Sequence, residues 1–313
     1  MSSTDTTAPA GARFERQAAT IRDWVTADGS SGFAAEPGRY HLYVSLACPW
    51  AHRTMIVRRL KGLEDVISLS VVDPIRDERS WAFRDVPGAE PDPVNGFSFL
   101  REAYEATVPG WDAHVSVPVL WDRERGRIVN QESADIVVML NDAFNDWATP
   151  GVDLYPEALR AEIDDLNGWV YDTVNNGVYK AGFSSHQQAH EEAVTALFVS
   201  LDRLEERLTD QRYLFGNQTT LADWRLFTTL LRFDPVYNGH FKCNVRRIVD
   251  YPALWGYLRD LLSVPGIRDT VNMDHIKRHY YMTHPQINPM RIVPVGPTLD
   301  YDQPHGREAL TTA

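Results

Sequence analysis

The sequence contains two cysteines, and one of them stands where a thiol becomes reactive. Cys48 follows the strand-like run HLYVSLA, and Pro49 and helix-forming residues come directly after it. Because proline suits the first helical position, this order places the cysteine at the N-cap of a helix. Unpaired backbone N–H groups and the positive end of the helix dipole then favour the thiolate, which is the nucleophilic form. We therefore predict a reactive thiol at Cys48 rather than a buried structural cysteine.

Two further motifs suggest a binding site around this thiol. Position 51 is alanine, so no C-x-x-C pair is present, and we expect exchange with an external small thiol. In thioredoxin-like folds a cis-proline opens the strand that faces the reactive thiol, and Val117 before Pro118 would pair with a bound peptide. The alternative for Pro118 is an ordinary proline at a strand start. Glu132 and Ser133 begin the next predicted helix, where they either bind an anionic ligand or simply cap the helix.

The first half of the chain shows the pattern of a small α/β domain. A strand, a helix and a strand form a β-α-β unit, which implies a parallel pair of strands, and a hairpin and a helix follow. A long insert, residues 74–113, separates these two parts, and loops of this length are usually functional or contain short helices. The predicted elements lie at 40–46, 50–61, 66–72, 117–122, 126–130 and from 132 onward.

The second half is predicted to be helical. Candidate helices lie at about 157–176, 187–209, 221–232, 251–262 and 272–281. Thr220 followed by Asp223 resembles a capping box at the start of one of them. We therefore predict a flexible N-terminal extension, a small α/β domain that contains the insert, and an all-helical domain that ends in an extended tail; the resemblance given below implies that the first domain is thioredoxin-like and binds the thiol and that the second binds the substrate. Their ranges are 1–34, 35–146 and 157–313.

Composition narrows the class of protein. The 43 acidic and 31 basic residues give a net charge of −12, which argues against nucleic acid or an anionic membrane surface as the main partner. No run approaches the ~20 apolar residues of a membrane span, and the N-terminus has no signal-peptide core, so we expect a cytoplasmic protein. Two cysteines make no disulfide framework, and no His or Cys cluster suggests a metal.

Three segments, taken together, carry a resemblance to a known family. They are SLACPWAHRTMIVRRLKGLEDVISLSVVDP, NNGVYKAGF and LLRFDPVYNGHFKCN. With the Val-Pro and Glu-Ser pairs, they resemble the glutathione transferase fold, and more narrowly its Xi class, the glutathionyl-hydroquinone reductases. The resemblance covers roughly residues 35–290. It implies a thioredoxin-like domain joined to an all-α domain, and usually a homodimer that associates through the helical domain.

The resemblance also implies a reaction in which glutathione is the co-substrate. Cys48 would attack the sulfur of a glutathionyl-hydroquinone, the hydroquinone would leave, and a second glutathione would release oxidised glutathione. It implies that glutathione is held by Trp81, Val117, Glu132 and Ser133. It further implies that three phenols reach the ring from the helical domain, namely Tyr179, Tyr237 and Tyr280. Without the resemblance, tyrosines on helices are more often packing residues, and a tryptophan in a loop is as often a core or loop-anchoring residue as a ligand contact.

The sequence also departs from the family, and other functions stay open. Asp-Ala-His at 112–114 stands where relatives have Gly-Arg, so a cationic contact to glutathione is missing or comes from elsewhere, such as Arg101. The alternatives are an omega-like thiol transferase or dehydroascorbate reductase, with glutathione or another small thiol, and a non-catalytic binding protein of this fold. A transferase that conjugates glutathione is disfavoured, because it needs a Ser or Tyr hydroxyl where Cys48 stands.

Two residues near this chemistry are not assigned a role in it. His52 follows Cys48 by four positions and could lower the pKa of the thiol, but we expect it to pack or to be solvated. Cys243 would need to lie within disulfide reach of Cys48 to resolve a mixed disulfide, and we expect a buried structural thiol instead.

Overall fold

The computed structural model describes residues 13–311. They form two compact units, and each is described here by itself. The first unit contains residues 17–157 and 262–294. Of the described residues, the second unit contains 13–16, 158–261 and 295–311. This division differs from the predicted domain ranges for residues 17–34 and 262–294, which both group with the thioredoxin-like part.

A four-stranded mixed sheet forms the centre of the first unit, with the strand order β2-β1-β3-β4. β1 pairs with β2 in parallel and with β3 antiparallel, and β3 pairs antiparallel with β4. The strands are β1 (Tyr40–Val44), β2 (Ser68–Val71), β3 (Val119–Asp122) and β4 (Arg127–Asn130). The β-α-β unit and the hairpin are as the sequence predicts, and the thioredoxin-like fold of this unit is confirmed.

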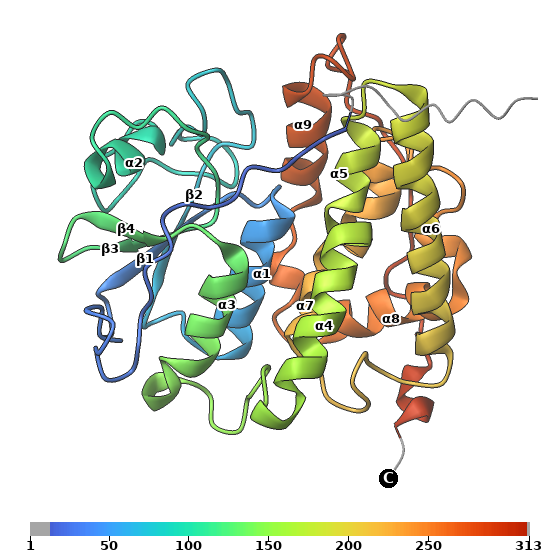
Figure 1. Cartoon of the computed structure of the whole chain (residues 1–313), viewed down its shortest axis with the longest axis horizontal. Helices are drawn as coiled ribbons and strands as arrows, with labels where there is room; N and C mark the ends of the chain where they lie inside the picture. Colours follow the sequence, from blue (N-terminus) through green and yellow to red (C-terminus); the bar gives the residue numbers. More distant parts are fainter. Residues whose placement is uncertain (1–12, 312–313) are drawn as a thin grey trace, which may run out of the picture. The chain divides into compact units, whose positions relative to one another are not determined.

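Two helices pack together beside this sheet. α1 (Pro49–Leu60) and α3 (Ser133–Asp142) lie side by side in Figure 1. β1 is buried along its whole length, and the ring of Tyr40 meets that of Phe144 just after α3, with 5.9 Å between the ring centroids. A strand buried on both faces needs a second cover, and the insert supplies it.

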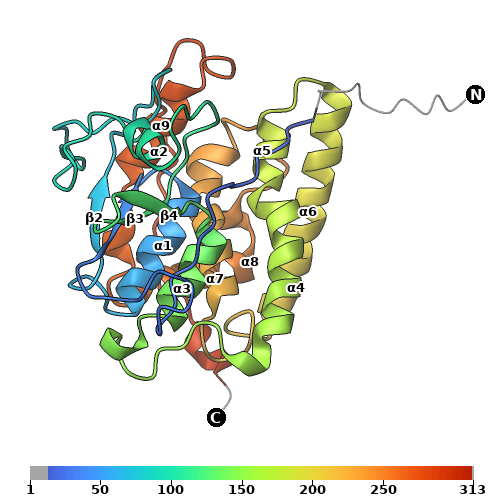
Figure 2. The ribbon, with the colours of Figure 1, turned by 60° about the vertical axis from the view of Figure 1, so that its left-hand side comes forward.

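The insert, residues 74–113, packs against side chains of β1 and β3, and Figure 2 shows its course next to the sheet. It contains α2 (Arg101–Thr107), in line with the expectation of short helices. Phe83 packs against Tyr43 and Phe97 against Trp121, with 5.2 and 5.7 Å between the ring centroids. The Tyr43 hydroxyl donates to Asp92 Oδ1 at 3.0 Å, which fixes the middle of the insert to the sheet. The insert is therefore a packed part of the unit.

The segment before β1 is also packed, although the sequence suggested a flexible extension for residues 1–34. Residues 1–12 of that extension lie outside the described part of the chain. Ile21 and Val25 are buried, and the backbone bonds to β4 through Asp23 N to Val129 O at 2.9 Å. Residues 17–34 are held in place by these buried apolar side chains and by backbone hydrogen bonds. The polar composition of the N-terminus gave no indication of this packing.

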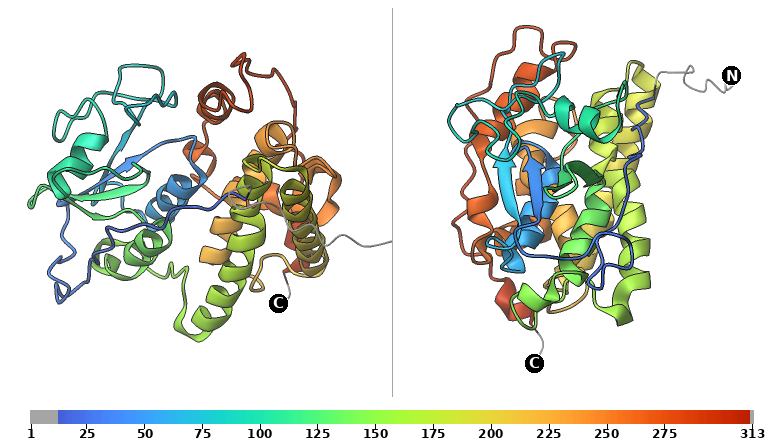
Figure 3. Two further views of the ribbon diagram at one scale, coloured as in Figure 1. Left: turned by 45° about the horizontal axis from the view of Figure 1, so that its top comes forward. Right: turned by 90° about the vertical axis from the view of Figure 1, so that its left-hand side faces the viewer.

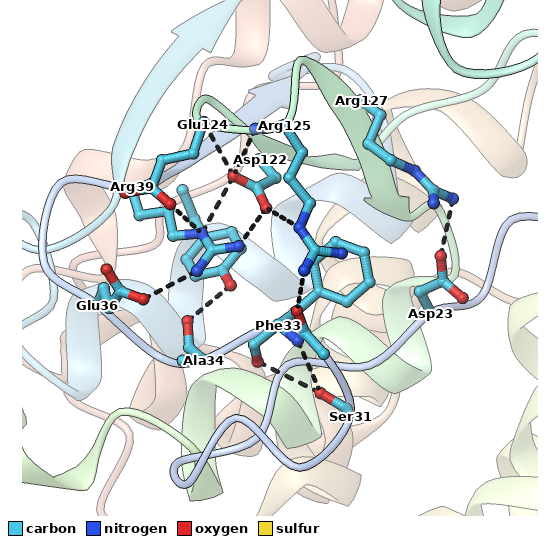
Figure 4. A network of polar contacts seen from close by, with 12 residues as sticks. Asp23, Ser31, Phe33, Ala34, Glu36, Arg39, Asp122, Glu124, Arg125 and Arg127 are labelled. Carbon is cyan, nitrogen blue, oxygen red and sulfur yellow. Dashed lines mark hydrogen bonds and ion pairs between the residues drawn. The ribbon is translucent and has the colours of Figure 1, made fainter.

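A network of charged residues fastens this segment to the β3–β4 hairpin (Figure 4). Arg39 donates to both oxygens of the fully buried Asp122, at 3.1 and 2.7 Å, and also to Glu36 at 2.8 Å. Arg127 pairs with Asp23 at 2.8 Å. A bidentate pair satisfies a buried carboxylate, which would otherwise be costly to bury.

The second unit is helical. α4 (Arg160–Val170) and α5 (Gly177–Gly182) follow one another beside the long α6 (Gln187–Thr209), as Figures 1 and 2 show, and α7 (Leu221–Arg232) packs on α4. α8 (Pro252–Ser263) completes the unit. The predicted capping box of α7 is confirmed, with Thr220 N donating to Asp223 Oδ2 at 2.7 Å. None of the helices within residues 13–311 has the length and apolar character needed to cross a membrane.

Two π-helical turns interrupt the helical unit at Tyr171–Asn175 and Phe233–Tyr237. The first splits the predicted helix 157–176 and leads into α5, and the second extends the end of α7. Asn175 donates to Thr229 Oγ1 at 2.8 Å, which ties the first turn to α7. Such turns occur often at functional sites, and hydrophobic periodicity does not predict them.

α9 (Met273–Thr283) belongs to the first unit, although the sequence suggested a place in the helical domain (Figure 3). Its histidines bond to the insert. His275 Nε2 lies 2.7 Å from the Pro87 carbonyl oxygen, and His279 Nδ1 lies 2.8 Å from that of Pro74. These contacts span about two hundred residues of sequence, so local patterns could not indicate them.

Candidate active site

Cys48 is the N-cap residue of α1. Its backbone is extended, with φ −78° and ψ 124°, and Pro49 follows at the first helical position. The side chain is only 9% exposed, and Sγ lies 3.5 Å from the carbonyl oxygen of Val117. The Val117–Pro118 bond is cis. The structure therefore brings together the predicted thiol and the predicted peptide-pairing residue, at the end of a helix that favours the thiolate.

Trp81 lies in the insert and is 4% exposed. Its ring stacks on the imidazole of His279, with 4.9 Å between the centroids and 22° between the planes. Within residues 13–311 its indole Nε1 has no hydrogen-bond partner. A buried donor without a partner costs roughly 1–3 kcal/mol, and such groups call for an explanation. Trp81 thus combines a packed ring with a donor that a ligand could use.

Glu132 and Ser133 stand at the start of α3, as predicted. Glu132 is the N-cap, and its Oε1 accepts a hydrogen bond from Ala134 N at 3.0 Å. Ser133 is buried, and its Oγ donates to the same Oε1 at 3.4 Å. Asn130 Oδ1 accepts a hydrogen bond from Glu132 N at 2.7 Å, and this bond fixes the turn between β4 and α3. The Glu132 carboxylate therefore caps the helix, and one of its oxygens makes both of these contacts.

Two of the predicted tyrosines meet in the helical unit. The hydroxyls of Tyr179, on α5, and Tyr237, at the end of the second π-helical turn, lie 3.5 Å apart. The ring of Phe241 stacks on Tyr237 and packs against Tyr179, each at 5.5 Å. Gly182 makes room for it, because an added Cβ would come within 2.2 Å of the Phe241 ring. The π-helical turn and this close packing fix how the two phenols are oriented.

Tyr280 lies apart from this pair, on α9 of the first unit. It is buried and follows His279, the residue that stacks on Trp81. The prediction placed all three tyrosines in the helical domain. The structure instead groups Tyr280 with Cys48, Trp81 and the insert, because the histidines of α9 bond to the insert.

Among the residues that sequence reasoning missed, some touch predicted site residues, and His279 and Arg16 are two polar examples. His279 stacks on Trp81, and Arg16 lies with Cζ 4.6 Å from the ring centroid of Tyr179. Arg16 Nε also donates to Asn176 Oδ1 at 2.9 Å, which fixes the guanidinium. No sequence signal singles out either residue, since each contact joins segments far apart in the chain.

The residues that were not assigned a role behave as expected. His52 is buried, with Nε2 2.7 Å from Thr270 Oγ1. Cys243 is fully buried, and burial raises the pKa of its thiol, which keeps it protonated and unreactive. Arg101, which the sequence suggests as a possible source of the cationic contact to glutathione, donates to the Trp111 carbonyl oxygen at 3.0 Å. Within residues 13–311, no three His, Cys, Asp or Glu side chains are grouped so that they could hold a metal ion.

Each unit contains a segment that matches a domain of a known protein family. Residues 47–143 match the glutathione S-transferase N-terminal domain, and residues 187–260 match the glutathione S-transferase C-terminal domain. The two matches together cover more than half of the chain.

Individual relatives narrow the assignment. Glutathionyl-hydroquinone reductase YqjG of Escherichia coli is 54% identical, over 95% of this chain and 93% of its own length. Its glutathione-bound structure has a TM-score of 0.91, with 92% of this chain and 96% of that chain covered. Glutathionyl-hydroquinone reductase PcpF of Sphingobium chlorophenolicum is 49% identical, over 93% and 92% of the two lengths.

A structure from a further relative carries the class name. The Xi class glutathione transferase of Natrialba magadii has a TM-score of 0.92 and 51% identity, over 95% of this chain and 93% of that chain. Identity at this level over nearly the whole chain shows the family, and the predicted fold and class are confirmed. The chain is a member of the glutathione S-transferase family, in the Xi class of glutathionyl-hydroquinone reductases.

Proposed function

We propose that this protein removes glutathione from glutathionyl-hydroquinones and that Cys48 is the nucleophile. The observation that carries the proposal is the position of Cys48 at the N-cap of α1, with Sγ beside the Val117 carbonyl, in a chain whose relatives bear this activity in their names. Cys243 offers no competing nucleophile, because it is buried and its pKa is raised.

The reaction proceeds in two displacements at sulfur. The Cys48 thiolate attacks the glutathionyl sulfur, an S–S bond forms, and the C–S bond to the ring breaks. The ring carbon keeps the electron pair of that bond and takes a proton, so the product is the free hydroquinone. The thiolate of a second glutathione then attacks the mixed disulfide, which releases oxidised glutathione and restores the Cys48 thiolate. The sum consumes one substrate and one glutathione.

Glutathione is held by residues of the first unit, to which Cys48 also belongs. The start of α3 offers N–H donors and the Ser133 hydroxyl to the glutamyl carboxylate, and Glu132 accepts from the ammonium. The main chain of Val117 pairs with the cysteinyl residue. The buried Nε1 of Trp81 supplies a further donor. The donors and acceptors here suit a zwitterionic peptide, and none of these roles requires a metal.

The phenols of Tyr179, Tyr237 and Tyr280 bind the hydroquinone and assist proton transfer to its carbon. A phenol can donate its proton to a ring oxygen or accept a hydrogen bond from a ring hydroxyl, so it suits either state of the leaving group. The hydroxyl oxygens of Tyr179 and Tyr237 lie 3.5 Å apart, which supports a joint role. Two hydroxyls this close can both reach the same oxygen atom of a bound hydroquinone.

The remaining expectations belong to the same proposal. The protein works in the cytoplasm as a homodimer that associates through its helical unit, and neither nucleic acid nor membrane is a partner. The net charge of −12 supports the last point. Sedimentation of the purified protein tests the dimer.

A steady-state assay tests the activity. Wild-type protein is given glutathionyl-menadiol and glutathione, and menadiol and oxidised glutathione are measured. Wild type forms both products in equal amounts, Cys48→Ser forms neither, and Cys243→Ser behaves as wild type. Failure of folded wild type to form menadiol, while it still binds glutathione, would overturn the proposal. Activity with dehydroascorbate and none with the menadiol adduct would favour the omega-like alternative.

A further inference from the structure

The insert carries three arginines close to Trp81, and one of them differs from the others. Arg79 pairs with Asp77 at 2.7 Å, and Arg84 pairs with Asp73 at 2.9 Å. Arg76 forms no ion pair and donates no hydrogen bond within residues 13–311, although it is half-buried. A guanidinium carries five N–H donors and a permanent charge, so a half-buried one without a carboxylate is unusual.

Arg76 and Cys48 follow the ends of two neighbouring parallel strands, β2 and β1, at the same edge of the sheet. Val72 N donates to Val44 O at 2.9 Å, and each of the two residues stands four positions beyond this bond. The Arg76 Cζ lies 5.8 Å from the ring centroid of Trp81, so the cation lies near the ring that is proposed to line the glutathione site. Burial lowers the pKa of Arg76, and the charge that opposes this effect is that of Cys48. The sulfur of Cys48, when ionised, is therefore within electrostatic reach of this guanidinium, and the attraction acts equally in both directions.

We propose that Arg76 is a positioning residue whose guanidinium stabilises the thiolate of Cys48 and so sets the pH at which the thiol reacts. The inference rests on the proposed function, in which that thiolate is the nucleophile. A permanent cation near a thiol favours its ionised form, and the effect is strong where water is partly excluded. The chain has a net charge of −12, so a local cation at this point also opposes the field of the whole protein.

The other charged or titratable groups of the elements around Cys48 already have partners. On α1, His52 bonds to Thr270, and the Arg53 guanidinium lies 4.4 Å from the Trp50 ring centroid. Glu132 caps α3, and His279 bonds to the Pro74 carbonyl oxygen. Asp77 pairs with Arg79, and Asp73 pairs with Arg84. Among the arginines of the insert near Trp81, Arg76 is therefore the one whose charge has no carboxylate partner within residues 13–311.

The test measures the ionisation of Cys48 without any substrate. Full-length protein is alkylated with iodoacetamide over a range of pH, and the rate at the Cys48 peptide is followed by mass spectrometry. We compare wild type with Arg76→Gln and Arg76→Lys. Arg79→Gln is the matched control, because it removes the same charge from the same insert. Thermal unfolding of each variant shows that it is folded.

We expect the apparent pKa of Cys48 to rise by about one unit in Arg76→Gln, so the alkylation rate falls roughly tenfold at any pH below both apparent pKa values. Arg76→Lys keeps most of the wild-type profile, and Arg79→Gln keeps all of it. An unchanged profile in Arg76→Gln would overturn the inference, as would an equal shift in Arg79→Gln. If wild type reduces the hydroquinone adduct and the profile is unchanged, the role of Arg76 alone is wrong. If the profile shifts but wild type reduces no adduct, Arg76 keeps its role and the proposed activity is wrong.

Discussion

Replacement of His279 by alanine tests whether α9 holds Trp81 in its place. The imidazole makes two contacts with the insert, a stack on Trp81 with 4.9 Å between the ring centroids and a hydrogen bond to the Pro74 carbonyl oxygen at 2.8 Å. Both contacts are buried, because His279 and Trp81 are 8% and 4% exposed. Their loss should therefore affect both stability and the geometry around the thiol.

The cost can be worked out from these contacts. A ring stack contributes about 0.5–1.5 kcal/mol beyond burial, and a hydrogen bond about 0.5–1.5 kcal/mol. His279→Ala should then lower the free energy of unfolding by about 2 kcal/mol. Because a displacement of about 1 Å near the reacting atoms can reduce the rate ~100-fold, we expect kcat/KM to fall tenfold or more.

A matched variant separates the two effects. His275 lies on the same helix and bonds to the Pro87 carbonyl oxygen at 2.7 Å. Its loss should cost about 1 kcal/mol of stability and leave kcat/KM within about threefold of wild type. His279→Phe keeps the stack, loses the hydrogen bond, and should retain more activity than His279→Ala. Urea unfolding and initial rates on the menadiol adduct provide the numbers. Equal losses of activity in His275→Ala and His279→Ala would refute the reasoning, since Trp81 would then not depend on the stack.

Three other perturbations have defined outcomes. Gly182→Ala forces the Phe241 ring to move and should cost about 1–3 kcal/mol in urea unfolding and lower turnover; unchanged stability would mean that the contact is loose. Burial lowers the pKa of His41 to about 4, below its unfolded value near 6.5, so its contribution to stability is full above pH 6.5 and is lost as the pH falls toward 4. This loss is about 2 kcal/mol at pH 5, and His41→Gln should weaken the decline in unfolding free energy between pH 7 and 5; an equal decline would contradict this. Glu132→Ala removes the cap of α3, so it should cost about 1 kcal/mol of stability and weaken glutathione binding in calorimetry, and a change in neither would be inconsistent with both roles.

Local rules predicted the thiol and the elements that position it. Cysteine followed by proline predicts a helix N-cap from the stereochemistry of two residues, and Cys48 occupies that position. The capping box at Thr220 is equally local. Periodicity gave most helices to within a few residues, because each buries one stripe of apolar side chains.

The features that the sequence did not reveal depend on contacts between distant segments. α9 groups with the insert through the bond between His279 and Pro74, and residues 17–34 pack on β4 through backbone bonds such as Gln131 N to Ile21 O. Arg76 differs from Arg79 in lacking a carboxylate partner and in being less exposed, and these differences appear only once the insert is folded. Tyr280 likewise falls in a different unit from Tyr179 and Tyr237, because α9 packs on the insert.

The most direct test of the account is to trap the covalent intermediate. Wild-type protein is mixed with one equivalent of glutathionyl-menadiol in the absence of free thiol, and the intact mass and the released menadiol are measured. The account predicts one glutathionyl group on Cys48, one equivalent of menadiol, and loss of the adduct when glutathione is added. Release of menadiol without an adduct, or an adduct at Cys243, would contradict it.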